Sequence, residues 1–319
     1  MKLFSKPICL FLVGAALAAS GHAQVITENF GSGANAFSID FVKVGNPGNA
    51  ADTTGSPNPA GAVGYEYNIG KFEISRSIVE KASTAGALGI TVNTAYSLTQ
   101  PVIGVSWNEA ARFVNWLNTS RGFQEAYNFT ATGANANLTL WGAGQYNGNN
   151  AFRHKDAVFV LPSLDEWYKA AYYDPTLNSG AGGYWDYATR SNTAPTAVSS
   201  GTTSGTAVYN RGSTFTPADV NNAGGLSYYG TMAQNGNAWD RMETAADGVN
   251  NDPTESRGIR GGKVNWTGGL AANEIDFGTP TTHESSDVTF RVAMVPEPSA
   301  LSLLAVGLGV VLRRRRRTV

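Results

Sequence analysis

The sequence predicts an α+β fold with few regular elements and many loops. Three segments begin with a serine followed three residues later by a glutamate, which is the pattern of a helix N-terminus. Short alternating segments typical of strands lie before and after them, without the strand–helix–strand order of a parallel α/β protein. The 37 glycines, with frequent asparagine, proline and serine, indicate that much of the chain forms loops.

Two segments near the start are predicted strands. In Phe37–Asn46, the residues Ile39 and Phe41, with Val44, favour one face. Tyr65–Ser75 returns to the same alternation. The segment between them is rich in asparagine, glycine and proline and is therefore expected to be a loop.

Helices are predicted to start at the pairs Ser77–Glu80, Ser106–Glu109 and Ser163–Glu166, because each pair can satisfy free N-terminal amides reciprocally. The second helix carries an apolar stripe at helical spacing: Ala110, Phe113, Val114 and Leu117. The third has a similar stripe: Leu164, Trp167, Ala170 and Ala171. Asp174-Pro175 is expected to end this third helix.

The second half of the chain contains fewer regular elements. Tyr184–Tyr229 is predicted to be mostly loop with isolated aromatic residues. Asn235–Thr244 is expected to form a compact turn that leads into an extended piece. Ser256–Trp266 and Val288–Val295 are predicted late strands.

The N-terminus predicts export. Lys2 and Lys6 precede the apolar run Ile8–Ala18, and Gly21 and Ala23 occupy the two positions that a signal peptidase inspects. We therefore expect residues 1–23 to be a signal peptide and residues 24–295 to form the folded domain.

The C-terminal residues 296–319 are expected to form a third region. Ser299–Leu312 is small and apolar apart from two serines, and Arg313–Arg317 follows it. As a helix this run would rise about 1.5 Å per residue, roughly 21 Å, which is short of the ~30 Å hydrocarbon core. We expect a short membrane helix whose arginines stay on the cytoplasmic side, with the domain outside the cytoplasm.

Composition excludes several classes of function. The chain has 23 basic and 24 acidic residues. Two of the lysines lie in the expected signal peptide, five arginines lie in the C-terminal tail, and Glu297 lies beside that tail. The domain therefore has 16 basic and 23 acidic residues, a net charge of −7. Because phosphate binding needs a basic surface, we expect no nucleic-acid partner.

Thiols and imidazoles are scarce. The single cysteine, Cys9, lies in the expected signal peptide, so disulfides, thiolate chemistry and cysteine–metal sites are excluded for the mature domain. Beyond His22, the chain has only His154 and His283, so one copy cannot supply three imidazole ligands. Both of these histidines are expected at the surface.

The chain resembles the formylglycine-generating enzyme family, also called sulfatase-modifying factor domains. The matching stretches are, in order, YNIGKFEIS, PVIGVSWNEAARFVNWLN, LPSLDEWYKAAYYDP, YWDYAT, GNAWD, RGIRGGKVNW and TFRVA. The opening DFVKVGNPGNAADTTG is similar to a subgroup of exported bacterial proteins. The resemblance implies a heavily looped fold related to C-type lectins.

The tail resembles the PEP-CTERM sorting signal. Its motif is Pro296, Glu297 and Pro298, followed by the apolar run and the arginines. This resemblance implies recognition, with cleavage, by an exosortase-type enzyme, and a cell-surface or extracellular-matrix location after transient anchoring in the membrane.

The family's known activity oxidises a substrate cysteine to formylglycine with two active-site cysteines that bind copper. The mature domain has neither cysteine, and thiolate is the soft ligand that copper(I) prefers. Other relatives use iron held by histidines from a partner domain, which this chain also lacks. The sequence therefore argues against the family's oxidation and leaves open a non-cysteine metal-dependent oxidoreductase or hydrolase.

The resemblance also implies a possible calcium site. Gly236 and Ala238 would offer carbonyl oxygens and Asp240 a carboxylate, all of which suit this ion. Ala233 and Arg241 depart from the family pattern, so the competing interpretation is a tight turn with a buried tryptophan. No other cofactor is expected.

Loop aromatics form a second candidate site. Aromatic rings with amide neighbours can bind sugars or peptides, and they can equally fill the core of a loop-rich fold. The candidates are Trp141, Trp185, Tyr187, Tyr228 and Tyr229. Arg257, Arg260 and Arg291 are expected to pair with internal carboxylates.

Together these observations favour a non-enzymatic role. We expect an exported, surface-sorted protein that uses an oxidase-like scaffold as a binding or structural module of the extracellular matrix. Its expected partners are signal peptidase, the exosortase-type enzyme, and extracellular polysaccharide or peptide.

Overall fold

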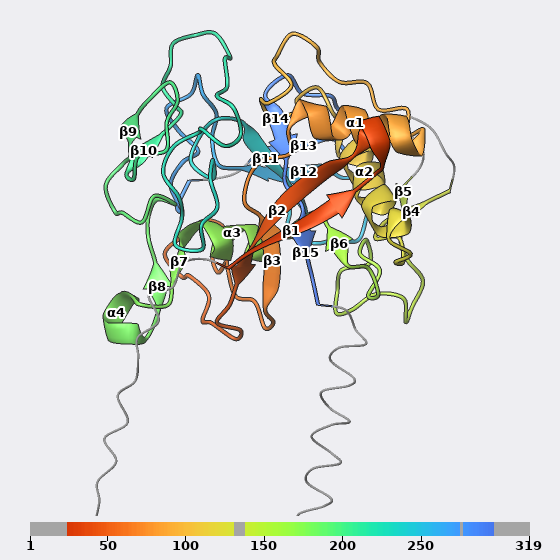
Figure 1. Ribbon diagram of the computed structural model, residues 1–319. Coiled ribbons are helices and arrows are strands. Elements are labelled where there is room, and N and C mark those ends of the chain that lie inside the picture. Colours follow the sequence, from red (N-terminus) through yellow and green to blue (C-terminus); the bar gives the residue numbers. More distant parts are fainter. Residues whose placement is uncertain (1–23, 131–137, 275–276, 297–319) are drawn as a thin grey trace, which may run out of the picture.

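The computed structural model describes residues 24–130, 138–274 and 277–296 of the 319 (Figure 1). A five-stranded antiparallel sheet has the order β1 (Val25–Phe30), β2 (Phe37–Val44), β3 (Tyr67–Gly70), β15 (Ala293–Met294) and β6 (Phe159–Val160). The last strand thus lies inside the sheet that begins the domain, which closes the fold on itself.

A second sheet has four strands in the order β13 (Phe277–Thr279), β12 (Arg257–Arg260), β11 (Trp239–Ala245) and β14 (Val288–Phe290). β11 and β14 pair in parallel, and the other neighbours are antiparallel. Three small two-stranded sheets complete the strands: β4 (Asn128–Phe129) with β5 (Leu138–Thr139), β7 (Tyr173–Asp174) with β8 (Gly183–Tyr184), and β9 (Thr196–Ala197) with β10 (Thr206–Ala207).

The helices are η1 (Gly33–Asn35), α1 (Arg76–Gly86), α2 (Trp107–Ser120), α3 (Leu164–Tyr172) and α4 (Leu177–Gly180). α4 is an irregular turn, because Asn178 and Ser179 have positive φ angles. The mixture of helices, short strands and long loops confirms the predicted α+β class.

The strand β1 was not predicted from the sequence. Its residues Ile26 and Glu28 are half-buried and Phe30 is buried, while the alternate residues are exposed. It forms a hairpin with β2 through a turn at Gly31, where φ is +67° and a Cβ would lie 2.3 Å from the carbonyl oxygen of Asn35. Only glycine fits this turn without rearrangement.

Two of the three predicted helix starts are confirmed. Ser106–Glu109 and Ser163–Glu166 form complete capping boxes at the starts of α2 and α3. The predicted start at Ser77 is wrong. α1 begins at Arg76, and Glu80 accepts a hydrogen bond from Arg76 Nε (2.7 Å) instead of capping the helix.

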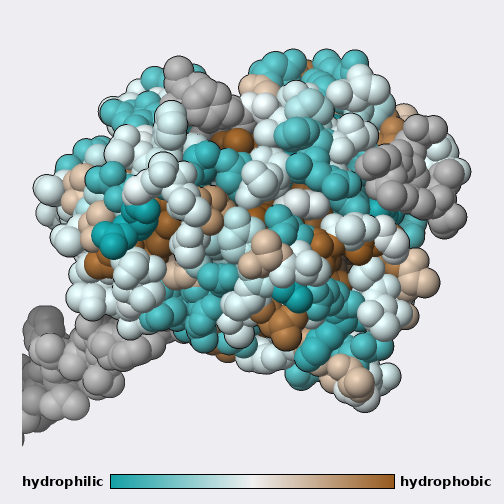
Figure 2. Space-filling model, turned by 90° about the horizontal axis from the view of Figure 1, so that it is seen from above, coloured by the Kyte–Doolittle hydropathy of each residue, from teal (hydrophilic) through white to brown (hydrophobic). Residues whose placement is uncertain are grey.

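The main core lies between the five-stranded sheet and the helices α1 and α2. The predicted stripe on α2 is fully buried: Ala110, Phe113, Val114 and Leu117. Phe113 meets Phe290 of β14 edge to face at 5.5 Å, which joins α2 to the four-stranded sheet. Seen from above, exposed apolar residues form separate small patches among polar ones (Figure 2).

The remaining strand predictions are confirmed in part. β2 covers most of Phe37–Asn46, whereas Tyr67–Gly70 forms the strand within the second predicted segment and Ser75 makes an isolated bridge with Pro101. β12, β14 and β15 lie in the predicted late strands, and β11 begins in the extended piece that was expected within Asn235–Thr244. No helix within the described residues is both long and apolar enough to cross a membrane. The expected signal peptide, the apolar run and the motif residues Glu297 and Pro298 lie outside the described residues.

We expect Ser106→Ala to lower the free energy of unfolding by about 0.5–2 kcal/mol, because Ser106 Oγ caps α2. Ser75→Ala is the matched control, since the Ser75 side chain makes no capping hydrogen bond to α1. Urea unfolding of both variants measures the difference. Equal losses would contradict the importance of the capping box.

Candidate functional site

An ionic cluster with two fully buried carboxylates, Glu166 and Glu243, lies beneath one face of the domain. Arg153 Nη1 and Nη2 donate to Oε1 and Oε2 of Glu166 at 2.8 and 2.9 Å, and its Nε donates to Glu243 Oε1 at 2.9 Å. The Tyr127 hydroxyl also donates to Glu243 Oε1 (2.9 Å). The Tyr65 hydroxyl donates to Glu166 Oε1 (2.6 Å). This cluster connects α3, β11 and the segment before β3.

The cluster's protonation states follow from its geometry. Burial opposes the charge on Glu166, but Arg153 outweighs burial and holds the pKa of this carboxyl below its usual range. Burial also opposes the charge on Arg153, and the carboxylates of Glu166 and Glu243 raise its pKa well above the ordinary value. The guanidinium is therefore charged and bonded to two carboxylates.

A pocket of about 380 Å³ opens above this cluster, which we call the polar pocket. Its lining residues are Tyr65, Asn147, Gly148, Asn150, Arg153, His154, Lys155, Val295 and Pro296. Asn150 is fixed by its own contacts, since its Nδ2 donates to Glu243 and its Oδ1 accepts from Asn250 Nδ2 (2.9 Å). Several lining side chains are thus held in place before any ligand binds.

His154 is not the surface residue that the sequence predicted, because only 7% of it is exposed. Trp141 packs edge to face against its ring at 4.7 Å, and Trp141 Nε1 donates to the carbonyl of Ala126 (2.9 Å). Of the predicted aromatic candidates, Trp141 therefore supports the polar pocket without lining it. His283 is exposed, as predicted.

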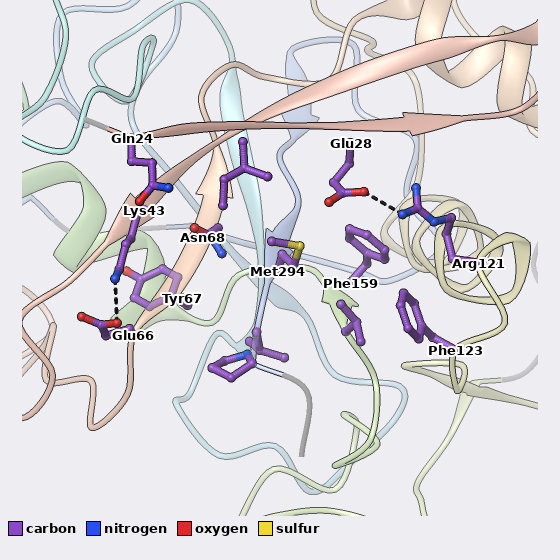
Figure 3. A pocket seen from close by; sticks show the side chains of 14 residues that line it. Gln24, Glu28, Lys43, Glu66, Tyr67, Asn68, Arg121, Phe123, Phe159 and Met294 are labelled. Atoms are coloured by element: carbon purple, nitrogen blue, oxygen red, sulfur yellow. Dashed lines mark ion pairs between the residues drawn. The ribbon is translucent and has the colours of Figure 1, made fainter. Parts of the chain in front are cut away.

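A larger pocket of about 540 Å³, which we call the sheet groove (Figure 3), shares the lining residues Val295 and Pro296 with the polar pocket. Its lining residues are Gln24, Ile26, Glu28, Lys43, Glu66, Tyr67, Asn68, Arg121, Phe123, Val158, Phe159, Met294, Val295 and Pro296. Pro296, the first residue of the predicted sorting motif, thus lines both pockets.

Two ion pairs flank the sheet groove (Figure 3). Lys43 Nζ lies 2.8 Å from Glu66 Oε2, and Arg121 Nη2 lies 2.9 Å from Glu28 Oε2. Between them, Asn68 Oδ1 is buried with no hydrogen-bond partner among the described residues. The groove therefore combines apolar walls with one unsatisfied acceptor, features of a binding surface.

The predicted aromatic residues are divided between regions. Trp185 Nε1 donates to Asp174 Oδ2 (3.1 Å), and Arg190, 3.6 Å from the same carboxylate oxygen, lies over the ring of Tyr228 at 5.3 Å. Tyr229 is buried against Tyr228 at 5.1 Å. Trp185, Tyr228 and Tyr229 therefore lie around Asp174, and none of them lines either pocket.

Tyr187 does not belong to this group of three aromatic residues around Asp174. It is half-buried, and its backbone forms an isolated bridge with Ser191. The five aromatic candidates thus do not line a common pocket among those described above.

The predicted calcium loop is organised by protein groups. Asp240 Oδ2 accepts from Arg291 Nε (2.7 Å) and Trp167 Nε1 (2.9 Å), while Asp240 Oδ1 has no partner among the described residues. Ala238 N donates to Glu73 Oε1 (3.2 Å), and Asn237 Nδ2 donates to Glu73 Oε2 (2.5 Å).

This geometry does not fit calcium. The ion takes six to eight oxygen ligands, whereas the carboxylate of Asp240 already pairs with a guanidinium. Gly236 has φ +98° and a Cβ there would lie 2.3 Å from the Val208 carbonyl oxygen, so close packing explains its identity. Within the described residues, no group of three or more His, Cys, Asp or Glu side chains could hold a metal ion.

The predicted pairing of buried arginines with carboxylates is confirmed for two of them. Arg291 pairs with Asp240, and Arg257 Nη1 lies 3.1 Å from Glu255 Oε1. Arg260 Nη2 donates to the carbonyl of Ala272 (3.0 Å), and its guanidinium lies over the ring of Tyr168 at 5.0 Å.

Tyr65 and Arg153 were not predicted as site residues from the sequence. One signal could have found them. Glu166 was predicted as a helix-capping residue, and such a carboxylate has acceptor capacity left for other donors. The sheet groove had no such signal, because its lining comes from segments far apart in the sequence.

The chain matches the sulfatase-modifying factor enzyme 1-like domain over residues 32–295. No curated protein matches the chain. Among solved structures it is similar to Treponema denticola variable protein 1, with 17% identity, 85% of this chain and 99% of that chain covered, and a TM-score of 0.56.

Two further solved structures are similar. CarF has 17% identity, with 81% of this chain and 98% of that chain covered and a TM-score of 0.58. PvdO from Pseudomonas aeruginosa has 14% identity, with 84% and 98% covered and a TM-score of 0.50. At these identities the similarity establishes the shared fold.

We expect chelator to leave the melting temperature of the protein unchanged, because Arg291 occupies the carboxylate that calcium would need. An ion bound at 100 times its dissociation constant would stabilise the fold by about 2.7 kcal/mol. Thermal unfolding with and without EDTA, and with added calcium, measures this. A drop of several degrees in EDTA that calcium reverses would contradict the expectation.

We expect Glu166→Gln to cost about 3–5 kcal/mol of stability at pH 7, because it leaves Arg153 without its bidentate partner. The lowered pKa of Glu166 contributes stability above its ordinary value of 4.5, and this contribution is lost as the pH falls through the folded-state pKa. The difference between wild type and variant should therefore shrink in acid.

Urea unfolding at pH 7 and in acid measures this difference. Glu125→Gln is the control, since Glu125 is exposed. A difference between wild type and Glu166→Gln that stays the same at all pH values would rule out the ionic origin of the effect.

Proposed function

From the premise that the chain belongs to the sulfatase-modifying factor enzyme 1-like family, we propose that it is an exported, surface-sorted binding module of the extracellular matrix. It keeps the family's scaffold and does not carry out the family's cysteine-dependent oxidation. The proposal has three supports: the residues available for chemistry, the two pockets, and the terminal segments.

The residues available do not fit the copper site of the family's known activity. That site needs two cysteines, and the only cysteine of this chain is Cys9, in the expected signal peptide. Thioether sulfur is a weaker alternative, and Met232 and Met242 are buried in separate apolar clusters. No step of the oxidation is therefore assigned to this chain.

The adjacent pockets are the observation that carries the binding role. The polar pocket and the sheet groove share Val295 and Pro296, and their volumes of about 380 and 540 Å³ are typical of small-ligand sites. Much of the polar pocket's lining is fixed by buried hydrogen bonds and ion pairs. A lining that is ordered in advance lowers the entropy lost on binding.

The terminal segments support export and sorting. A signal-like N-terminus implies cleavage by signal peptidase after Ala23, which would make Gln24, a residue that lines the sheet groove, the first residue of the mature protein. The sorting motif starts at Pro296, at the surface between the two pockets. An exosortase-type enzyme would therefore act directly beside the binding surface, with the membrane engaged through the C-terminal run before cleavage.

We expect removal of residues 297–319 to release a folded domain into the medium, because the truncation leaves Pro296 and both pocket linings intact. Fractionation of cells that express the full chain or the truncated chain, with circular dichroism of the released protein, measures this. A truncated protein that stays cell-bound or misfolds would contradict the sorting role of the tail.

The non-enzymatic part of the proposal has a separate check. Incubation of the purified protein with a cysteine-containing sulfatase peptide should yield no formylglycine by mass spectrometry. Formylglycine in that peptide, or stoichiometric iron or copper in active protein, would instead favour a metal-dependent enzyme.

A further inference from the structure

We infer that the polar pocket binds a pyranose ring of a neutral polysaccharide, with the ring stacked on Tyr65 and its hydroxyl groups hydrogen-bonded to the opposing polar side chains. This inference rests on the proposed binding function and names the ligand class of one of its two pockets. Four features of the pocket carry it: a fixed aromatic ring, a set of donors, an adjoining strand that is paired on both sides, and the local charge.

The aromatic platform is Tyr65. The residue is 37% exposed, yet its hydroxyl is fixed by the 2.6 Å hydrogen bond to Glu166, which Arg153 holds with two further bonds. Tyr67 packs against the Tyr65 ring edge to face at 6.2 Å. An exposed ring that cannot rotate freely offers contact area at low entropic cost, as a stacking surface requires.

The hydroxyl of Tyr65 also remains protonated. Burial and the nearby Glu166 carboxylate raise its pKa above the ordinary value, so the hydrogen bond persists across the neutral range. The orientation of the ring is therefore stable under the conditions in which an extracellular protein works.

The donors come from the segment that includes His154 and Lys155. Asp156 N donates to His154 Nδ1 (3.1 Å), so in the neutral ring the proton is on Nε2, which is then a donor. Burial lowers the pKa of His154, which favours this neutral form at pH 7. Asn147 adds an amide, and Lys155 an ammonium group, to the lining. Sugar hydroxyls can accept from all three.

The pocket is less suited to a peptide. Extended peptides commonly bind by adding a strand to an open sheet edge. The strand that ends at this pocket, β15, is paired on both sides, with β3 and with β6. Pro296, which follows it, has no backbone N–H to donate. A ligand in this pocket is therefore recognised by side chains and not by strand pairing, which suits a sugar.

The charge distribution favours a neutral sugar over an acidic one. Arg153 is already bonded to two carboxylates, so its charge is compensated within the protein. The domain as a whole carries 16 basic and 23 acidic residues, a net charge of −7, which repels a polyanion. The volume of about 380 Å³ lies near the lower end of small-ligand sites, so the pocket suits a short stretch of a polymer.

Affinity electrophoresis of the full-length protein tests the inference. Native gels contain dextran, starch or xylan as neutral polymers, or alginate as an acidic one. We expect retardation by at least one neutral polymer, with Tyr65→Ala weakening the apparent affinity by about tenfold or more, and Lys155→Ala by a few-fold.

Two further variants make the test specific. Tyr65→Phe keeps the ring and removes the hydrogen bond to Glu166, so an intermediate loss of about threefold is expected. Trp266→Ala is the matched control, because Trp266 is 49% exposed and lines neither pocket. Its affinity should equal that of the wild type. Near-UV circular dichroism and the melting temperature show whether each variant is folded.

Any other outcome overturns the inference, and the outcomes differ in which part of it they refute. Retardation that Tyr65→Ala leaves unchanged would place the sugar elsewhere, and retardation by alginate alone would refute the neutral ligand. Binding to a peptide array alone, lost in Tyr65→Ala, would refute the sugar and keep the binding module. If no polymer or peptide binds, the inference is refuted. The sorting role of the tail is still tested separately, by fractionation of cells that express the truncated chain.

Discussion

The placement of Arg153 between Glu166 and Glu243 is the interaction on which this face of the protein depends. Burying three charges is costly unless each one is paired and hydrogen-bonded, and the planar guanidinium satisfies both carboxylates at once. Glu166 lies in the first turn of α3 and Glu243 lies in β11. The cluster therefore sets the position of this helix relative to the four-stranded sheet.

The same constraint orients Tyr65 in the lining of the polar pocket. In a fold with few strand ladders, buried charge pairs replace regular hydrogen bonding as the means of fixing loops. Tyr65 precedes β3 in a loop, and its ring is oriented because Glu166 is immobile. A second pair, Asp240 with Arg291, does the same for the turn before β11, where Glu73 also binds the backbone at Ala238.

The sequence predicted the features that local spacing encodes. The capping boxes at Ser106 and Ser163, the buried stripe of α2 and the α+β class depend on residues a few positions apart. The strand β1 was missed, because its inner face alternates apolar and charged residues, and its burial depends on the partner strand β2. The pockets were missed for a similar reason, since distant segments form them.

The contacts that hold the fold together are separate from the cysteines that the family's oxidation needs, and this separation explains how the scaffold can serve a binding function. None of the interactions that fix α3, β11 and the turn before β11 involves a thiol, so the fold does not require the cysteines of its oxidising relatives. On the proposed function, one small pocket would bind a single sugar unit weakly. Many copies sorted to one surface and facing a repeating polymer would bind with an avidity about 10²–10⁴ times the single-site affinity. On this proposal, surface sorting supplies the many copies that raise the avidity of a small rigid pocket, an advantage that an enzyme acting on a single soluble substrate would not gain.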